Sequence, residues 1–89
     1  HEDLYVLDVR TPEEFVAGHV PGAVNIPVDQ VAARLDEVPK DKDVVLYCKA
    51  GRRAGIAADV LAANGYKRLS HLEGDMNAWV EKGRPLAKP

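Results

Sequence analysis

The sequence predicts an α/β fold: a three-layer sandwich in which a central, mostly parallel β-sheet carries helices on both faces. Two observations lead to this prediction. Three short segments with strand preference, at 4–9, 44–47 and 66–72, are each followed by a segment of helical character. The connectors between them are polar or contain glycine or proline, and no internal repeat interrupts the alternation. Because 89 residues suit one small domain, we expect a single domain over residues 1–89.

The first strand and helix have clear boundaries. Residues 4–9 are mostly apolar and fit a central strand, with Asp8 near its carboxyl end and therefore at the rim of the sheet. Thr11 is followed by a proline, and Glu14 stands three residues after Thr11. This is the capping-box pattern of a helix start, and Gly18 ends the helix.

The next part of the chain predicts a minor strand and a second helical segment. A strand of two or three residues fits around Val24. In the stretch 28–38, apolar residues recur at spacings of four and three, at Val31, Leu35 and Val38. This spacing predicts one helical segment with a single buried stripe.

The last two units follow the same alternation. A helix over 54–64 is expected to end at Gly65, and 66–72 is expected to form the final strand. A further helix contains Trp79, which we expect to anchor the core. The residues expected on the sheet-facing side of helix 54–64 are Ala57, Val60, Leu61 and Asn64.

The segment 44–54 holds the candidate active site. A β-branched and aromatic run stops at Cys48, and a short basic loop then leads into a helix. Cys48 therefore lies at the carboxyl end of a buried strand, where open α/β sheets bind ligands. A lone cysteine is often an inert buried residue, but this position favours a nucleophile.

The loop after the cysteine resembles an anion cradle. The backbone N–H groups of residues 49–53 are expected to converge above the sulfur, because Gly51 permits the turn. The following helix directs the positive end of its dipole to the same place. Together with the basic side chains, these dipoles favour the thiolate, which is the nucleophilic form. The basic side chains are those of Lys49, Arg52 and Arg53.

Composition excludes several classes of site and partner. The formal net charge is −2, and no apolar run approaches the length of a transmembrane helix, so we expect no nucleic-acid and no membrane partner. A single cysteine excludes an internal disulfide, a redox pair and a thiolate zinc cluster. His19 and His71 lack partners at metal-ligand spacing, so we expect turn or surface roles for both. The chain starts at His1 instead of Met, which indicates a processed or trimmed start and leaves the compartment open.

Three motifs resemble the rhodanese family and span nearly the whole chain in that family's order. The loop 48–54 reads Cys-Lys-Ala-Gly-Arg-Arg-Ala, against the family form Cys-x-x-Gly-x-Arg-Ser/Ala. The amino-terminal motif consists of Asp-Val-Arg at 8–10, Glu-Phe at 14–15, Gly-His-Val-Pro-Gly-Ala at 18–23 and Asn-Ile-Pro at 25–27. The carboxyl-terminal motif is Leu-Glu-Gly at 72–74 with Trp79.

The chain departs from the family in two places. Members commonly have Gly-Gly where Glu73-Gly74 stands, a change that we expect to alter the turn without touching a catalytic atom. Members also usually have a strand and helix ahead of the Leu4 strand, and here these are absent or curtailed. The resemblance thus implies a minimal domain or a domain taken from a longer protein.

The resemblance implies a rhodanese-like sandwich and a sulfurtransferase that works by double displacement. Cys48 would take the outer sulfur of a thiosulfate-like anion or a persulfide donor, hold it as a persulfide, and pass it to cyanide or a thiol, including a protein thiol. No metal and no organic cofactor is needed. The residues expected to bind the anion are Lys49, Ala50, Gly51, Arg52 and Arg53.

Individual side chains of the site keep alternative roles. Lys49 and Arg52 either bind the donor or are simply solvated. The guanidinium of Arg53 is expected to brace loop carbonyls from within. Asp8 is expected to support the loop by hydrogen bonding together with Arg10.

Loop length separates neighbouring chemistries. In related cysteine phosphatases the arginine comes one residue later, which widens the cradle for a tetrahedral phosphate. Only four residues separate Cys48 from Arg53 here, so we expect sulfur transfer and not phosphatase or arsenate reductase activity. Two other hypotheses stay open: a non-catalytic binding module, against which the intact Cys48 argues, and a relay that passes sulfur only to a partner protein.

Overall fold

The computed structural model describes residues 3–88, so the expectation for His1 lies outside the described residues. Within this range it confirms the α/β class with a parallel sheet. The strands are β1 (Leu4–Asp8), β2 (Val24–Asn25), β3 (Asp43–Tyr47) and β4 (Leu69–His71), in the order β2-β1-β3-β4. The α-helices are α1 (Pro12–Ala17), α2 (Arg52–Ala63) and α3 (Asp75–Glu81). Two 3₁₀ segments are η1 (Val28–Ala33) and η2 (Leu35–Glu37).

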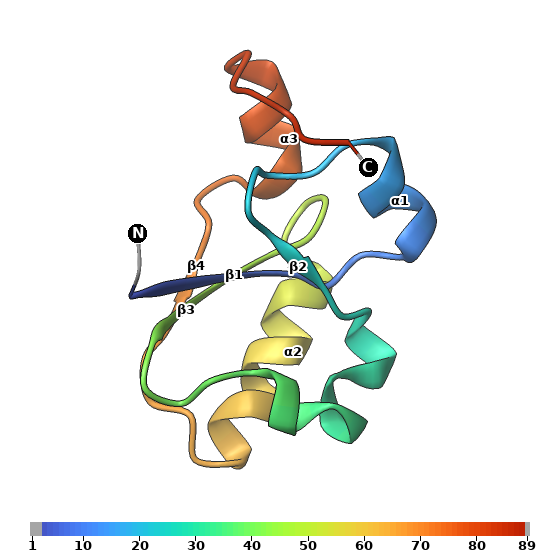
Figure 1. Cartoon of the computed structure of the whole chain (residues 1–89). Coiled ribbons are helices and arrows are strands. Elements are labelled where there is room, and N and C mark those ends of the chain that lie inside the picture. The colour runs from blue at the N-terminus through green and yellow to red at the C-terminus, as the bar shows by residue number, and fades with distance from the viewer. Residues whose placement is uncertain (1–2, 89) are drawn as a thin grey trace.

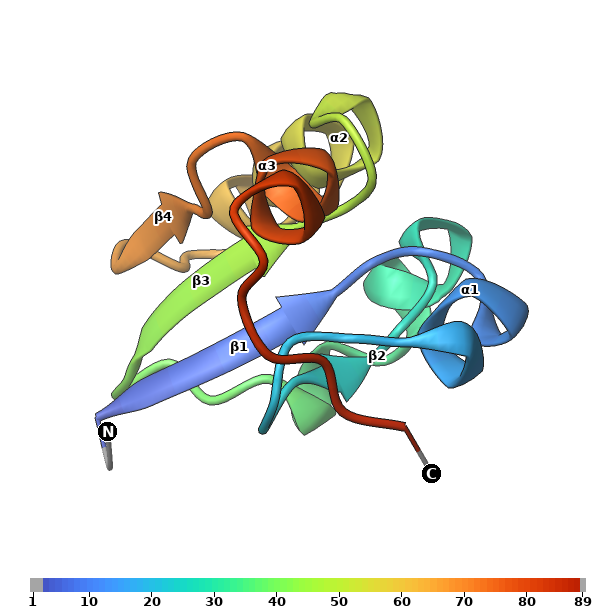
Figure 2. The same cartoon turned by 90° about the horizontal axis from the view of Figure 1, so that it is seen from above.

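The layers are visible in the cartoons. Figure 1 shows α2 and the two 3₁₀ segments on one face of the sheet and α3 on the other. Figure 2 shows the carboxyl-terminal segment running past α3 and over β1. Among residues 3–88, no helix is both long and apolar enough to cross a membrane.

The two central strands are β1 and β3. Their register pairs Leu7 with Leu46 and Asp8 with Tyr47. Because all strands run in the same direction, the carboxyl ends of β1 and β3 meet at one edge of the sheet. The chain leaves both strands there, which brings the segment after Asp8 next to the loop that begins at Cys48.

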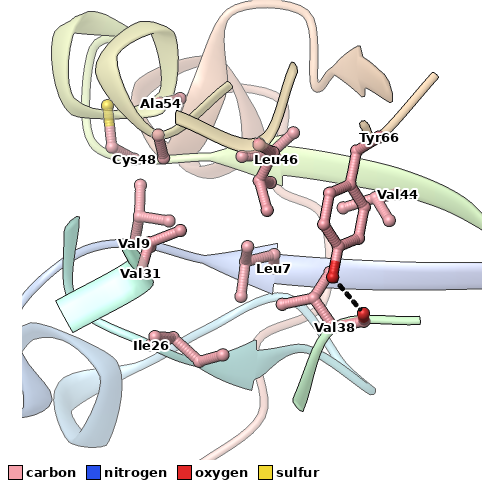
Figure 3. Close-up of a cluster of buried hydrophobic side chains, with 12 residues drawn as sticks. Leu7, Val9, Ile26, Val31, Val38, Val44, Leu46, Cys48, Ala54 and Tyr66 are labelled. Atoms are coloured by element: carbon pink, nitrogen blue, oxygen red, sulfur yellow. Dashed lines mark hydrogen bonds between the residues drawn. The ribbon is translucent and has the colours of Figure 1, made fainter. Parts of the chain in front are cut away.

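Strand β4 is shorter than the predicted strand 66–72. Tyr66 turns away from the sheet, and its hydroxyl lies 2.6 Å from the carbonyl oxygen of Val38 and 2.7 Å from that of Leu35. The tyrosine therefore fastens the 3₁₀ segments to the core and does not extend the edge strand, as Figure 3 shows for Tyr66 and Val38.

The main core lies between the sheet and α2 (Figure 3). Alternate residues of the central strands point into it, as the period of two requires. Helix α2 starts at Arg52, two residues before the predicted start, and buries Ala54, Ala57 and Leu61. Asn64, predicted on this side, is exposed because the helix ends at Ala63. The residues that the central strands contribute to this core are Leu7, Val44 and Leu46, together with Val9 directly after β1.

The predicted helical segment 28–38 is divided into η1 and η2. Arg34 lies between them in a non-helical conformation, with φ −123° and ψ 30°. The predicted stripe is still directed inward, since Val31 and Val38 are buried and Leu35 is half-buried against the core. The spacing predicted the buried side correctly, but the single helix was wrong.

The second face carries a smaller apolar cluster. Val20, Tyr47 and Met76 form its buried part, and Trp79 of α3 packs against them. Trp79 is only half-buried, and its Nε1 donates to the carbonyl oxygen of Pro85 at 2.7 Å. The tryptophan therefore anchors the carboxyl-terminal segment as well as the core.

Polar contacts hold α1 in place. None of its six residues is buried. The predicted capping box is present, with Thr11 Oγ1 accepting from the Glu14 N–H at 3.2 Å and Glu14 Oε1 accepting from the Thr11 N–H at 3.0 Å. The Glu14 carboxylate also binds the Arg53 guanidinium of α2 at 2.6 and 3.1 Å. The two helices are therefore joined by a two-point ion pair.

His19 follows α1 and is buried, so of the turn or surface role expected for it the structure leaves the turn role. Its ring stacks on Phe15 with centroids 3.6 Å apart, and Nδ1 lies 2.8 Å from the Phe15 carbonyl oxygen. This contact folds the chain back against α1 and positions the turn that leads to β2.

Replacing Glu14 with glutamine tests the ion pair. Hydrogen bonds from Arg53 lower the pKa of Glu14 from 4.5 to about 2. A carboxyl group whose pKa is lowered by folding stabilises the fold above its unfolded pKa and loses this contribution as the pH falls to its folded pKa. Both side chains are close to 30% exposed, so solvent screens the pair. We expect Glu14→Gln to lower the free energy of unfolding by about 1–2 kcal/mol near neutral pH.

The difference between Glu14→Gln and the parent should shrink between about pH 5 and about pH 2. Urea unfolding followed by circular dichroism at several pH values measures it. Glu13→Gln is the matched control, because Glu13 is an exposed neighbour on the same helix. Equal effects of the two substitutions, or a difference that does not vary with pH, would contradict the prediction.

Candidate active site

The candidate nucleophile directly follows β3. Cys48 is 1% exposed and extends the core, and Figure 3 shows its sulfur directed away from the apolar side chains. The loop is short, because α2 already begins at Arg52 with Gly51 as its cap. Gly51 has φ 120°, and a Cβ there would lie 3.0 Å from Asp75 Oδ2 and 3.3 Å from His71 Cε1. A glycine is therefore needed at this turn.

One backbone N–H contacts the sulfur. The Gly51 N–H donates to Cys48 Sγ at 2.9 Å. Of the N–H groups at 49–53 that were expected to converge on the sulfur, it is the one in hydrogen-bonding geometry among the described residues. The positive end of α2 begins immediately after it, so the sulfur faces both a donor and a helix dipole.

An open cavity of 540 Å³ lies over the loop. Lys49 and Arg52 are exposed at this cavity, and neither forms an ion pair with another residue of the range 3–88. The full lining consists of Cys48, Lys49, Ala50, Arg52, Arg53 and Ile56. The surface above the cysteine is therefore cationic.

Arg53 does not brace the carbonyls of the loop, as the sequence suggested. Its guanidinium binds the Glu14 carboxylate and not the carbonyls of the loop. The hydrogen bonds to Glu14 raise the pKa of Arg53, so the guanidinium stays charged. The reason could not be read locally, because α1 lies beside the start of α2 only in the folded chain. Arg53 thus adds an ion pair to the site where Lys49 and Arg52 add free charge.

Asp8 and Arg10 form a buried pair at the rim of the sheet. The Asp8 carboxylate accepts from Arg10 Nη2 at 2.6 Å and from the Arg10 backbone N–H at 2.9 Å. It also accepts from the Tyr47 hydroxyl at 2.6 Å. Burial, together with this hydrogen bond to Asp8, raises the pKa of Tyr47 above its ordinary value. The expected pairing is therefore present, and it reaches the residue directly before Cys48.

Asp75 contacts the loop and His71 contacts Asp75, and the sequence pointed to neither as a site residue, since His71 was expected to have a turn or surface role. Asp75 is 3% exposed, and its Oδ1 accepts from the Cys48 backbone N–H at 3.0 Å. His71 Nε2 lies 2.7 Å from the same oxygen. The N–H groups of Met76 and Asn77 donate to the carbonyl oxygens of Cys48 and Lys49 at 3.0 and 3.1 Å. The first turn of α3 therefore binds the loop directly.

The left-handed turn at the start of α3 lies one residue later than the Glu73-Gly74 pair singled out in the sequence. Gly74 and Asp75 both have positive φ, 74° and 55°, so the pair of positions that suits Gly-Gly is 74–75. A Cβ at Gly74 would overlap the Ala78 side chain, which explains the glycine there. Asp75, and not Glu73, is therefore the non-glycine residue at a left-handed position, and its side chain touches the backbone of the candidate nucleophile. The signal in the sequence was an aspartate directly after a glycine, because aspartate is among the residues that tolerate this conformation.

No group of three or more histidine, cysteine, aspartate or glutamate side chains is arranged to hold a metal ion within the described range.

Comparison with known proteins agrees with the fold. A rhodanese-like domain model matches residues 1–82. The chain is 40% identical over 88 residues to a sulfurtransferase of Allochromatium vinosum, an alignment that covers 99% of this chain and 82% of the relative. It is 40% identical over 70 residues to the thiosulfate sulfurtransferase PspE of Escherichia coli, covering 76% and 67%.

The backbone is also similar to solved structures. The crystal structure of a rhodanese-related protein from Thermoplasma volcanium matches with a TM-score of 0.90 and 28% identity, covering 99% of this chain and 87% of that one. The chain spans only 38% to 61% of the length of three other curated relatives. The sulfurtransferases among the relatives support a rhodanese-type role in sulfur transfer. On its matched domain, its fold and its relatives, the chain belongs to the rhodanese family.

Proposed function

We propose that this domain is a sulfurtransferase that moves sulfane sulfur from thiosulfate or a persulfide donor to cyanide or a thiol through a persulfide on Cys48. The main support is the Gly51 N–H, which lies 2.9 Å from Cys48 Sγ at the start of α2. A backbone N–H directed at the sulfur stabilises negative charge there, both on the thiolate and on a persulfide. Thiosulfate is favoured as donor because it is named for the Escherichia coli relative.

The reaction consists of two displacements at sulfur. The Cys48 thiolate attacks the outer sulfur of thiosulfate, a new S–S bond forms, and sulfite leaves with the electron pair of the S–S bond that breaks. Cyanide or a thiolate then attacks the outer sulfur of the persulfide. The S–S bond of the persulfide breaks, thiocyanate or a new persulfide leaves, and Cys48 is again a thiolate. No oxidant or reductant is consumed.

The surface charges suit an anionic donor. Lys49 and Arg52 line the cavity over Cys48 with no ion-pair partner in the described chain, so their field is not cancelled locally. A second cavity of 380 Å³ lies between α1 and α3 and is also lined by Lys49. Lys49 can therefore attract an anion from either side of the loop. The pairs Asp8–Arg10 and Glu14–Arg53 are internally compensated.

Intact mass spectrometry tests the persulfide. The reduced protein is incubated briefly with thiosulfate, and we expect the parent to gain one sulfur atom because Cys48 is its one nucleophilic thiol. Cyanide should remove this sulfur and release an equal amount of thiocyanate. Cys48→Ser is the control and should gain nothing. A parent that gains no sulfur from thiosulfate or from a small-molecule persulfide would sink the proposal and favour a binding module.

Substitution of the two free cations tests donor binding. We expect Lys49→Gln and Arg52→Gln each to raise KM for thiosulfate by about 3- to 10-fold with a smaller effect on kcat, because they attract the donor before reaction. The effect should weaken at high salt. Steady-state assays of thiocyanate formation measure it. Lys67→Gln is the matched control, since Lys67 is an exposed lysine at the opposite edge of the sheet. An unchanged KM in both loop variants would show that these charges are only solvated.

A further inference from the structure

We infer that Asp75, held by His71, is a positioning residue that fixes the main chain of Cys48 for sulfur transfer. The inference rests on the proposed function and adds a residue to it. The hydrogen bond of Asp75 is with the backbone of the nucleophile, whereas the sulfur is bound by the Gly51 N–H.

The first turn of α3 binds Cys48 on both sides of its Cα atom. Asp75 Oδ1 accepts from the Cys48 N–H at 3.0 Å, and the Met76 N–H donates to the Cys48 carbonyl oxygen at 3.0 Å. The Asn77 N–H continues the contact to the Lys49 carbonyl oxygen at 3.1 Å. Because both peptide groups of Cys48 are held, the direction of its Cα–Cβ bond is fixed as well. The sulfur is thereby kept under the Gly51 N–H.

The carboxylate of Asp75 has little freedom to move. His71 Nε2 lies 2.7 Å from Oδ1, and the side chain of His71 is 48% exposed whereas that of Asp75 is 4% exposed. The histidine thus covers the carboxylate on the solvent side. The other carboxylate oxygen, Oδ2, lies against Gly51, where a Cβ would approach it to 3.0 Å. His71 and Gly51 therefore hold Oδ1 on the Cys48 N–H.

The backbone conformation of Asp75 indicates that the residue is present for its side-chain contacts and not because the start of α3 requires an aspartate. Its φ of 55° is the one positive value at a non-glycine residue among those described. Glycine adopts this conformation without penalty, whereas a residue with a side chain adopts it rarely, aspartate and asparagine more often than most. The preceding turn, with Gly74 at φ 74°, already provides the left-handed geometry. The contacts of the side chain with Cys48 and His71 compensate the cost of this backbone conformation.

Two substitutions at Asp75 separate the side chain from the backbone. Asp75→Gly removes the carboxylate and suits the positive φ, and we expect kcat for thiocyanate formation to fall about 10-fold, the loss of one hydrogen bond, while KM for thiosulfate changes less than about 2-fold. Asp75→Asn keeps an acceptor oxygen and tolerates the same φ, so it should recover most of the loss. His71→Phe should give an intermediate fall in kcat, because the acceptor remains but is no longer held.

Two controls exclude a general loss of structure. Glu73→Gly removes an acidic exposed side chain from the same turn and introduces the same residue, and it should leave kcat unchanged. The thermal midpoint of Asp75→Gly should stay within a few degrees of the parent, because the relieved backbone offsets part of the lost contact.

Amide hydrogen exchange at Cys48, followed by NMR, should be faster in Asp75→Gly than in the parent.

The inference is overturned if Asp75→Gly keeps the parental kcat, or if Asp75→Asn loses as much as Asp75→Gly, since the acceptor would then not be what matters. Failure of the proposed function is distinguishable from failure of this inference. A parent that forms no persulfide refutes the proposed function. Hydrogen exchange at the Cys48 amide still tests whether Asp75 holds the main chain of Cys48. Exchange that is unchanged in Asp75→Gly refutes the positioning role whether or not the parent transfers sulfur.

Discussion

The parallel pairing of β1 with β3 is the contact on which the rest of the structure depends. It places Asp8 beside Tyr47 and buries Leu7 beside Leu46. Because both strands end at the same edge, the segment after Asp8 and the loop after Tyr47 leave the sheet side by side. The Val9 N–H, which donates to the Tyr47 carbonyl oxygen at 3.1 Å, continues the pairing up to the cysteine. The site is thus assembled by the sheet before any side chain of the loop contributes.

At the edge of the sheet where the site lies, the carboxylates have partners, whereas some of the described cationic side chains have no ion-pair partner. The carboxylates of Asp8 and Glu14 each bind an arginine, and the Asp75 carboxylate binds a histidine and a backbone N–H. Buried carboxylates require such partners, since an unpaired charge away from water is costly. Lys49 and Arg52, the two cations that line the cavity over the cysteine beside Arg53, have no ion-pair partner in the described chain. The paired charges build the site, and the free ones are the groups that we propose attract an anionic donor.

The two faces of the sheet are held by different forces. The face under α2 has the larger apolar core, which keeps that helix and the cysteine strand together. The opposite face has a small cluster, and α3 is held there as much by hydrogen bonds to the loop as by apolar contact. The position of α3 and the conformation of the loop therefore depend on each other. This dependence is what makes a residue at the start of α3 able to act on the cysteine.

Features that arise from neighbouring residues could be predicted from short stretches of the sequence. The alternation of strands and helices, the capping box at Thr11 and Glu14, and the cysteine at a strand end all follow from spacing and residue type within short windows. Only the tertiary structure decided the contacts between distant residues. Glu14 and Arg53 are 39 positions apart, and Cys48 and Asp75 are 27 apart. A short window contains no information on such pairs, because their distance is set by the order of the strands and the packing of helices on the sheet.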